Sequence, residues 1–228
     1  MSHSIEELQE KIGYVFQDQS LLKQAITHSS YANERKVNKV PDYERIEFLG
    51  DAVLELVSSE YLYKEYPDCK EGKLTKIRAS LVCEQSLAFC ADTIDLGQYL
   101  NLGKGEELTG GRHRASIIAD VVEAIIGAIY LDSGFEEAKS FIHRLILSDI
   151  QEKQLFYDAK TILQELVQKE GHALRYDLVK EEGPEHNKVF YVDVYEEENY
   201  LASGSGHSKK LAEQHAAYAA LLLRKSCI

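Results

Sequence analysis

Residues 115–131 constrain the fold of this chain more than any other segment. Asp120 and Glu123 are its only charged residues, and nearly every other position is apolar or small. A helix that is apolar on almost every side lies in a protein core, where ionised carboxylates are costly unless a cation or hydrogen bonds compensate them. The segment contains no lysine or arginine, so we predict a buried helix whose two acids meet a cation or ligand. Gly127, one turn beyond Glu123, would let another backbone or a ligand approach closely.

A second helix is predicted at about residues 43–66, and it carries three further acids. Glu44, Glu47 and Asp51 stand at offsets of 0, 3 and 7, which confines them to a sector of roughly 60° on a helix. Taken alone, such a trio is typical of a solvated acidic face. The apolar residues between them place these acids at the margin of a buried face instead.

The two helices together predict a metal site formed by Glu47, Asp51, Asp120 and Glu123. Oxygen ligands without cysteine or a nearby histidine favour Mg²⁺ or Mn²⁺ over Zn²⁺. Mg²⁺ keeps several waters and shares its coordination shell readily with phosphate, which suits phosphoryl chemistry. From spacing alone, metal-assisted hydrolysis of a phosphate ester and a purely structural acid cluster both remain open.

The pattern along the chain predicts two domains of different class. The first, residues 1–150, is all-α; a short connector follows at 151–157; the second, residues 158–228, is α+β in the order α-β-β-β-α. The acidic run at residues 196–198 is interpreted as a solvated turn. The predicted helices cover about residues 4–15, 43–66, 74–91, 115–131, 135–150, 161–170 and 208 onward, and the predicted strands cover 176–179, 189–195 and 200–203.

Charge and composition exclude several classes of protein. The formal net charge is −12, so the chain has no global attraction for nucleic acid, and any polyanion must bind through local basic clusters or metal ions. No uncharged run exceeds 10 residues, which argues against a membrane-spanning helix. The acidic N-terminus does not resemble a secretory signal, and the four cysteines follow no metal-ligand spacing. We therefore expect a cytoplasmic protein with reduced thiols and no membrane partner.

Residues 44–54, which read ERIEFLGDAVL, closely resemble the signature of the ribonuclease III family of double-strand-specific endoribonucleases. The likeness extends in order over about residues 5–150, through THSSY at 27–31, LGKGEE at 102–107 and DVVEA at 120–124. The one departure within the signature is Ile46, which stands where leucine is expected.

Residues 158–228 resemble a double-stranded-RNA-binding domain. The likeness rests on KTILQE at 160–165, GPEH at 183–186 and GSGHSKK at 204–210. Ser208 would cap the last helix, whose N-terminal amides, with Lys209 and Lys210, would bind phosphates. The expected RNA contacts in the minor grooves come from Gln164, Gln168 and His186. A related fold used for protein contacts is the other interpretation of this domain.

The two resemblances together imply an Mg²⁺-dependent endoribonuclease that acts on double-stranded RNA as a homodimer and accepts Mn²⁺ in place of Mg²⁺. Asp51 and Glu123 would be catalytic, and Glu44 and Glu71 match acidic family positions that line the cleavage valley. Each of two sites would cut one strand, leaving 5′-phosphate and 3′-hydroxyl ends with a short 3′ overhang. Processing of ribosomal and other structured RNA precursors is the expected role. The alternatives are a non-catalytic double-stranded-RNA-binding protein and an Mg²⁺-dependent hydrolase of small phosphorylated metabolites, which would leave the second domain unexplained.

Overall fold

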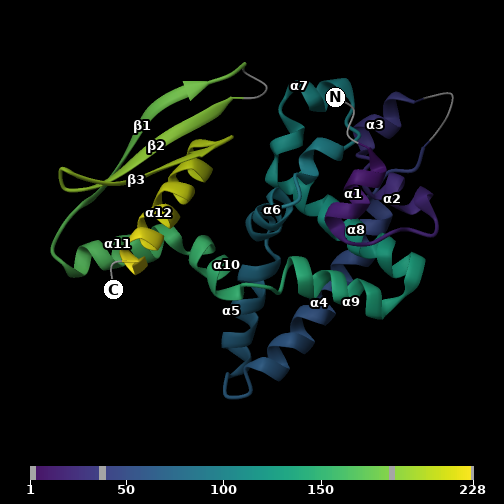
Figure 1. Cartoon of the computed structure of the whole chain (residues 1–228), viewed down its shortest axis with the longest axis horizontal. Helices are drawn as coiled ribbons and strands as arrows, with labels where there is room; N and C mark the ends of the chain where they lie inside the picture. Colours follow the sequence, from purple (N-terminus) through teal and green to yellow (C-terminus); the bar gives the residue numbers. More distant parts are fainter. Residues whose placement is uncertain (1–3, 36–39, 185–187, 227–228) are drawn as a thin grey trace. The chain divides into compact units, whose positions relative to one another are not determined.

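The computed structural model describes residues 4–35, 40–184 and 188–226, and divides the chain into two compact units, Met1–Ile150 and Gln151–Ile228 (Figure 1). The first is helical, and the second combines helices with a sheet. This is the predicted all-α unit followed by an α+β unit. Each unit is described by itself below.

The first unit is built from α-helices joined by two short 3₁₀ helices, η1 (Leu96–Tyr99) and η2 (Gly111–His113). Its α-helices are α1 (Ile5–Ile12), α2 (Gln19–Ala25), α3 (Ser29–Glu34), α4 (Glu44–Glu65), α5 (Glu71–Val82), α6 (Glu84–Asp92), α7 (Lys104–Leu108), α8 (Ala115–Ser133) and α9 (Phe135–Leu145).

Helix α8 is the centre of this unit, as its apolar sequence predicts. It packs against α2, α4, α6 and α9, and the side chains of residues 124–129 are buried without interruption. Because the helix is covered on several sides, its apolar residues contact different neighbours around the whole circumference. Within residues 117–129, Asp120 and Glu123 are the half-buried exceptions.

Two glycines set the distance between α4 and α8. A Cβ atom added to Gly50 would lie 1.7 Å from the backbone oxygen of Glu123, and one added to Gly127 would lie 2.3 Å from that of Ile46. The two backbones therefore touch where the helices cross, and a side chain at either position would force them apart. The close approach expected at Gly127 is confirmed, and the partner is a backbone.

Three predicted helical segments differ in detail from the structure, one of them the segment at 135–150, whose helix α9 ends at Leu145. Helix α1 is capped by Ser4, whose Oγ accepts a hydrogen bond from the Glu7 amide at 3.1 Å, but it ends at Ile12 and leaves Val15 exposed outside it. The segment predicted as one helix at 74–91 is two helices, α5 and α6, because the backbone at Cys83 is extended. The short helices α2, α3 and α7 are not among the predicted elements.

The second unit places two helices on one face of a three-stranded antiparallel sheet in the order β1-β2-β3 (Figure 1). Alanines at positions 212, 216, 217 and 220 form the buried face of the last helix. A Cβ on Gly204 would lie 2.2 Å from the Ala216 amide nitrogen, so this strand and helix are in close contact. The elements are α11 (Ala159–Lys169), β1 (Leu174–Glu182), β2 (Val189–Glu196), β3 (Asn199–Gly206) and α12 (Lys209–Ser226).

Residues 151–157, predicted as a connector, lie in helix α10 (Ile150–Tyr157). The Phe156 ring packs against His215 and Tyr218, with ring centroids 5.4 and 5.6 Å away, and Leu155 belongs to the core of the second unit. These apolar side chains explain why the segment is ordered against that unit.

None of the helices in residues 4–35, 40–184 and 188–226 is both long and apolar enough to cross a membrane. Over the same residues, Cys69, Cys83 and Cys90 form no disulfide.

Candidate active site and RNA-binding surface

The crossing of α4 and α8 brings together acids that lie far apart in the sequence. Glu47, Asp120 and Glu123 each offer a carboxylate oxygen within 4.8 Å of the others, and all three side chains are half-buried. Glu47 is held at the start of α4, where its amide donates to the Tyr43 carbonyl oxygen at 2.9 Å. The close backbone contact at Gly50 and Gly127 makes this convergence possible.

The pKa values of the three carboxyl groups are all raised. Burial, followed by the charges of Asp51, Glu47 and Asp120, raises the pKa of Glu123 to about 8. Burial and neighbouring acids, Asp120 first among them, raise the pKa of Glu47 to about 7. Burial also raises the pKa of Asp120. Each shift means that the ionised form is disfavoured in the absence of a cation.

Of the other three predicted acids, Asp51 and Glu44 lie beside this cluster, whereas Glu71 stands on α5, which begins beyond the far end of α4. Asp51 is exposed and lies outside the group of three, yet it is the neighbour whose charge raises the pKa of Glu123 most. Glu44 is exposed at the first position of α4 and raises the pKa of Glu47. Glu71 is exposed on the first turn of α5, where its Oε1 accepts from the Thr75 hydroxyl at 3.0 Å.

The donor set fits a hard divalent cation. Within the described part of the chain, no lysine or arginine forms an ion pair with Glu47, Asp51, Asp120 or Glu123. Oxygen atoms from four carboxylates suit Mg²⁺ or Mn²⁺, and a cation would offset the mutual repulsion that the raised pKa values record.

Tyr43 is a residue of this site that sequence reasoning did not identify. Its hydroxyl donates to Asp120 Oδ2 at 3.2 Å, and its ring lies against that of His28, with the centroids 5.7 Å apart. The side chain is buried, only 3% exposed. Its place immediately before the acidic helix was the one available signal.

Two of the motifs that resemble the ribonuclease III family, at residues 27–31 and 102–107, contact each other. His28 Nδ1 accepts from the Ser30 amide at 3.1 Å at the start of α3, and the Ser30 hydroxyl accepts from the Gly103 amide at 2.9 Å. The Lys104 amide donates to Glu34 Oε1 at 2.7 Å. Residues 27–31 and 102–107 therefore hold one another in place.

The predicted RNA-binding residues of the second unit that the structure describes lie on its helices or cap them. Ser208 Oγ accepts from the Leu211 amide at 3.1 Å and so caps α12, and Lys209 and Lys210 are exposed on its first turn. On α11, Gln164 is half-buried and Gln168 is exposed. His186 lies outside the described residues.

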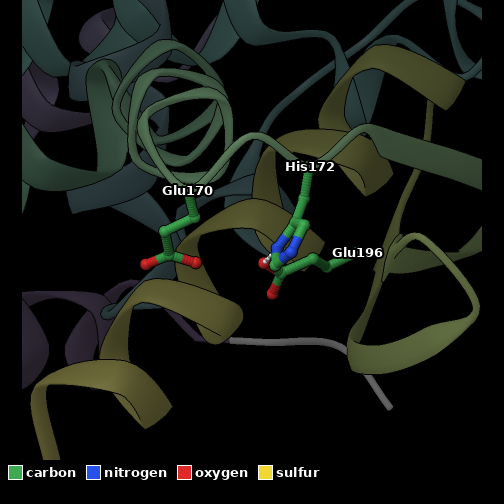
Figure 2. A group of neighbouring side chains, drawn as sticks. All are labelled: Glu170, His172 and Glu196. Carbon is green, nitrogen blue, oxygen red and sulfur yellow. Dashed lines mark hydrogen bonds and ion pairs between the residues drawn. The ribbon is translucent and has the colours of Figure 1, made fainter.

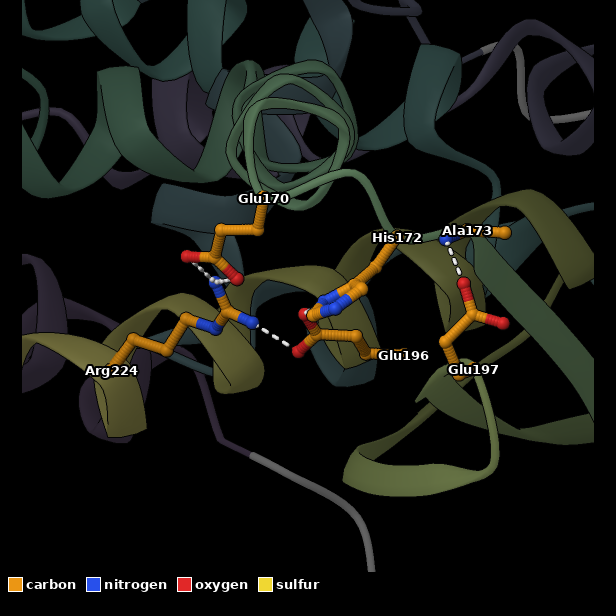
Figure 3. Close-up of polar contacts among 6 residues, drawn as sticks. All are labelled: Glu170, His172, Ala173, Glu196, Glu197 and Arg224. Carbon is orange, nitrogen blue, oxygen red and sulfur yellow. Dashed lines mark hydrogen bonds and ion pairs between the residues drawn. The ribbon is translucent and has the colours of Figure 1, made fainter.

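A second group with possible metal ligands consists of Glu170, His172 and Glu196 (Figure 2). Arg224 already supplies its cation: the guanidinium pairs with Glu170 Oε1 at 3.3 Å and with Glu196 (Figure 3). His172 Nδ1 also lies 2.6 Å from Glu196 Oε1. The group is therefore an ion-pair network within the second unit.

This network corrects the interpretation of residues 196–198 as a solvated turn. Glu196 is the last residue of β2 and is only 9% exposed, because strand alternation turns its side chain toward the core face. Glu197 and Glu198 are exposed, and Glu197 Oε1 accepts from the Ala173 amide at 2.6 Å (Figure 3). Of the three acids, Glu196 is therefore buried in the ion-pair network, whereas Glu197 and Glu198 are exposed to solvent.

Comparison with known proteins assigns both units. A Ribonuclease-III-like family model matches residues 18–150, and the double-stranded RNA binding motif matches residues 159–223. Ribonuclease 3 of Listeria welshimeri is 51% identical over 219 residues, 95% of this chain and 96% of the relative. Ribonuclease 3 of Natranaerobius thermophilus is 52% identical over 217 residues, 94% of each chain.

A solved structure agrees with these relatives. The nuclease domain of ribonuclease III from Campylobacter jejuni superposes with a TM-score of 0.59 at 45% identity, covering 63% of this chain and 96% of that domain. The extent of the matches, over both units and nearly the whole length, shows that the chain belongs to the ribonuclease III family and is an endoribonuclease that cleaves double-stranded RNA.

Proposed function

We propose that cleavage takes place at the crossing of α4 and α8, with Mg²⁺ held by Glu47, Asp51, Asp120 and Glu123 and replaceable by Mn²⁺. The observation that carries this proposal is the convergence of three half-buried carboxylates within 4.8 Å, with Asp51 beside them. Membership of the ribonuclease III family implies use of a divalent metal ion. The choice of Mg²⁺ rests on the all-oxygen donor set and on the affinity of this ion for phosphate.

The four acids differ in their surroundings, which suggests different tasks. When bound, the cation lowers the pKa of water and offsets negative charge on the scissile phosphate and the leaving 3′ oxygen. Glu123 is anchored in the buried helix α8, whereas Asp51 is exposed and accessible to a phosphodiester. We assign catalytic roles to Asp51 and Glu123, and supporting roles to the exposed acids Glu44 and Glu71.

A homodimer is part of this proposal. Phe48 and Leu56 on α4 are 80% and 59% exposed, and Ala52 between them is exposed as well. Residues at this spacing share one face of a helix, so α4 presents an apolar stripe next to its acids. A two-fold axis through this stripe would pair it with the same stripe of a second copy. The two sites would then each cut one strand, leaving a short 3′ overhang with 5′-phosphate and 3′-hydroxyl ends.

The second unit would hold the duplex by its shape. The capped N-terminus of α12 offers backbone amides and the cations of Lys209 and Lys210 to phosphates. Gln164 and Gln168 on α11, together with His186, would contact the minor grooves. Cleavage of ribosomal and other structured RNA precursors in the cytoplasm is the role we propose for such an enzyme.

A labelled, fully paired RNA of about two helical turns tests this proposal on a denaturing gel. We expect staggered cuts in Mg²⁺ and in Mn²⁺, and none in chelator or on a single-stranded control. Cuts that persist in chelator would overturn the metal site. An intact duplex in every lane, together with a shifted band on a native gel, would instead leave binding without catalysis.

A further inference from the structure

Glu181, near the end of β1, lies between two lysines from different elements. Its Oε2 is 3.3 Å from Lys188 Nζ, and its Oε1 is 3.6 Å from Lys209 Nζ. Lys209 Nζ also lies over the Phe190 ring, 5.8 Å from the centroid. One carboxylate therefore pairs with a cation immediately before β2 and with another on the first turn of α12.

Lys209 belongs to the surface that the proposed function assigns to RNA phosphates, and Lys188 shares its carboxylate partner; the present inference rests on that assignment. A carboxylate that bridges two lysines offers them the same kind of oxygen ligand as a phosphate does. A surface ion pair is weak, whereas a duplex presents a dense row of charges that can replace it. We propose that Glu181 is an internal competitor of RNA phosphate, which occupies Lys188 and Lys209 until a duplex displaces it.

The consequence is a lower affinity for RNA than the lysines alone would support. Each duplex that binds must separate Glu181 from its lysines, and Glu181 then remains beside the RNA backbone as an unfavourable negative charge. Lys210 forms no ion pair within the described residues, so the competition acts on Lys188 and Lys209. Binding would therefore depend more strongly on the groove contacts of α11.

The next residue of the same strand provides a matched control. Glu182 is exposed like Glu181, but its carboxylate pairs with Lys180 at 2.5 Å, because successive side chains of a strand point to opposite faces. Glu181→Gln and Glu182→Gln thus change the net charge equally and at almost the same place. Only Glu181→Gln removes a carboxylate partner from Lys188 and Lys209.

The test measures binding of the full chain to a fluorescent RNA duplex of about two helical turns by anisotropy, in chelator and over a range of KCl concentrations. Glu181→Gln should bind about two- to fivefold more tightly than the wild-type chain. Its salt dependence should steepen by about 0.9 for each lysine that gains a phosphate contact. Glu182→Gln should show a smaller change in both quantities.

The same two glutamate substitutions in a chain that lacks both lysines show whether the effect acts through Lys188 and Lys209. In the Lys188→Ala, Lys209→Ala chain, Glu181→Gln should have no more effect than Glu182→Gln. Equal effects of the two glutamate variants in the wild-type background would overturn the proposal, and weaker binding by Glu181→Gln would make this residue a support for the lysines. If instead Lys209→Ala with Lys210→Ala leaves binding unchanged, the assigned RNA surface itself is wrong.

Discussion

Tyr43 and Asp120, separated by 77 positions in the sequence, are joined by a hydrogen bond of 3.2 Å from the tyrosine hydroxyl to Oδ2 of the aspartate. Tyr43 also supplies the carbonyl oxygen that accepts from the Glu47 amide at 2.9 Å. One buried residue therefore positions a carboxylate on each of the two helices that form the site. Burial, followed by the charge of Asp120, raises the pKa of Tyr43, so its hydroxyl stays protonated and remains a donor.

Tyr43→Phe should weaken metal binding and slow cleavage about 10- to 100-fold, as losses of groups that orient metal ligands do. The missing hydrogen bond should cost about 0.5–1.5 kcal/mol of stability. Mn²⁺ titration and single-turnover cleavage measure the first two effects. Tyr14→Phe is the control, because Tyr14 donates to Asp132 at 2.6 Å in another part of the unit; an equal loss of metal affinity there would contradict a positioning role for Tyr43.

Glu123→Gln should abolish cleavage while leaving affinity for duplex RNA within about twofold of wild type, because RNA is held by the other unit. Without metal, the variant should be more stable at neutral pH, since the raised pKa of Glu123 shows that folding disfavours its ionised form, which the unfolded chain adopts freely there. Adding Mg²⁺ should raise the unfolding temperature of the wild-type chain and not of the variant. Glu10→Gln, an exposed substitution on α1, should alter none of these quantities. Loss of RNA binding in folded Glu123→Gln protein would contradict the assignment of cleavage to the first unit and RNA binding to the second.

The central architecture was predictable because it depends on local pattern. Residues 115–131 are apolar around the whole helix, which requires burial, and the two acids within them require compensation. Gly127 on the same face indicated a close approach, which the structure shows to be the backbone of α4. These deductions need only helical periodicity and the cost of burying charge.

Contacts between distant segments were not predictable in the same way. Nothing local indicates that Tyr43 reaches Asp120, or that Asp51 lies outside the group formed by the other three acids. The burial of Glu196 depends on Arg224, which is 28 positions further along the chain. The break at Cys83 involves no glycine or proline, so propensity alone favours one continuous helix there.

Lys209→Ala combined with Lys210→Ala should weaken RNA binding and reduce the salt slope by about 0.9 for each lost phosphate contact. Cleavage of saturating substrate should be affected much less than binding. Anisotropy titrations at several salt concentrations measure the slope. Lys23→Ala with Lys104→Ala removes the same charge from exposed positions of the nuclease unit and should have a smaller effect; an unchanged slope in the first variant would place the phosphate contacts elsewhere.

Phe48→Ser should shift the chain from dimer to monomer. A phenylalanine buried in an interface contributes about 1.5–3 kcal/mol, and a two-fold interface loses two of them at once. Light scattering coupled to gel filtration over a range of concentrations measures the mass. Val15→Ser removes an apolar side chain that is 74% exposed, comparable with 80% for Phe48, but outside α4. Equal dimerisation by both variants would show that the stripe on α4 is not the interface.

The network of Glu170, His172, Glu196 and Arg224 should make the stability of the second unit depend on pH. The hydrogen bond to Glu196 raises the pKa of His172 above its ordinary value of 6.5, and the same contact lowers the pKa of Glu196. Because the folded pKa of the histidine exceeds the unfolded one, its contribution is complete below about pH 6.5 and is lost as the pH rises through the folded value.

Protection of the buried α12 amides against hydrogen exchange, corrected for intrinsic rates, should therefore fall between pH 6 and pH 8.5 in the wild-type chain. His172→Gln should be less protected at pH 6 and should show a flatter dependence, with the two proteins converging at high pH. His143→Gln, which changes a histidine packed edge to face against Tyr61 in the first unit, should keep the wild-type slope. Parallel curves for wild type and His172→Gln would mean that the pair with Glu196 does not hold this end of the sheet against the helix. Convergence would show that a protonated histidine supplies part of the cohesion between β1, β2 and α12, alongside the permanent charge of Arg224.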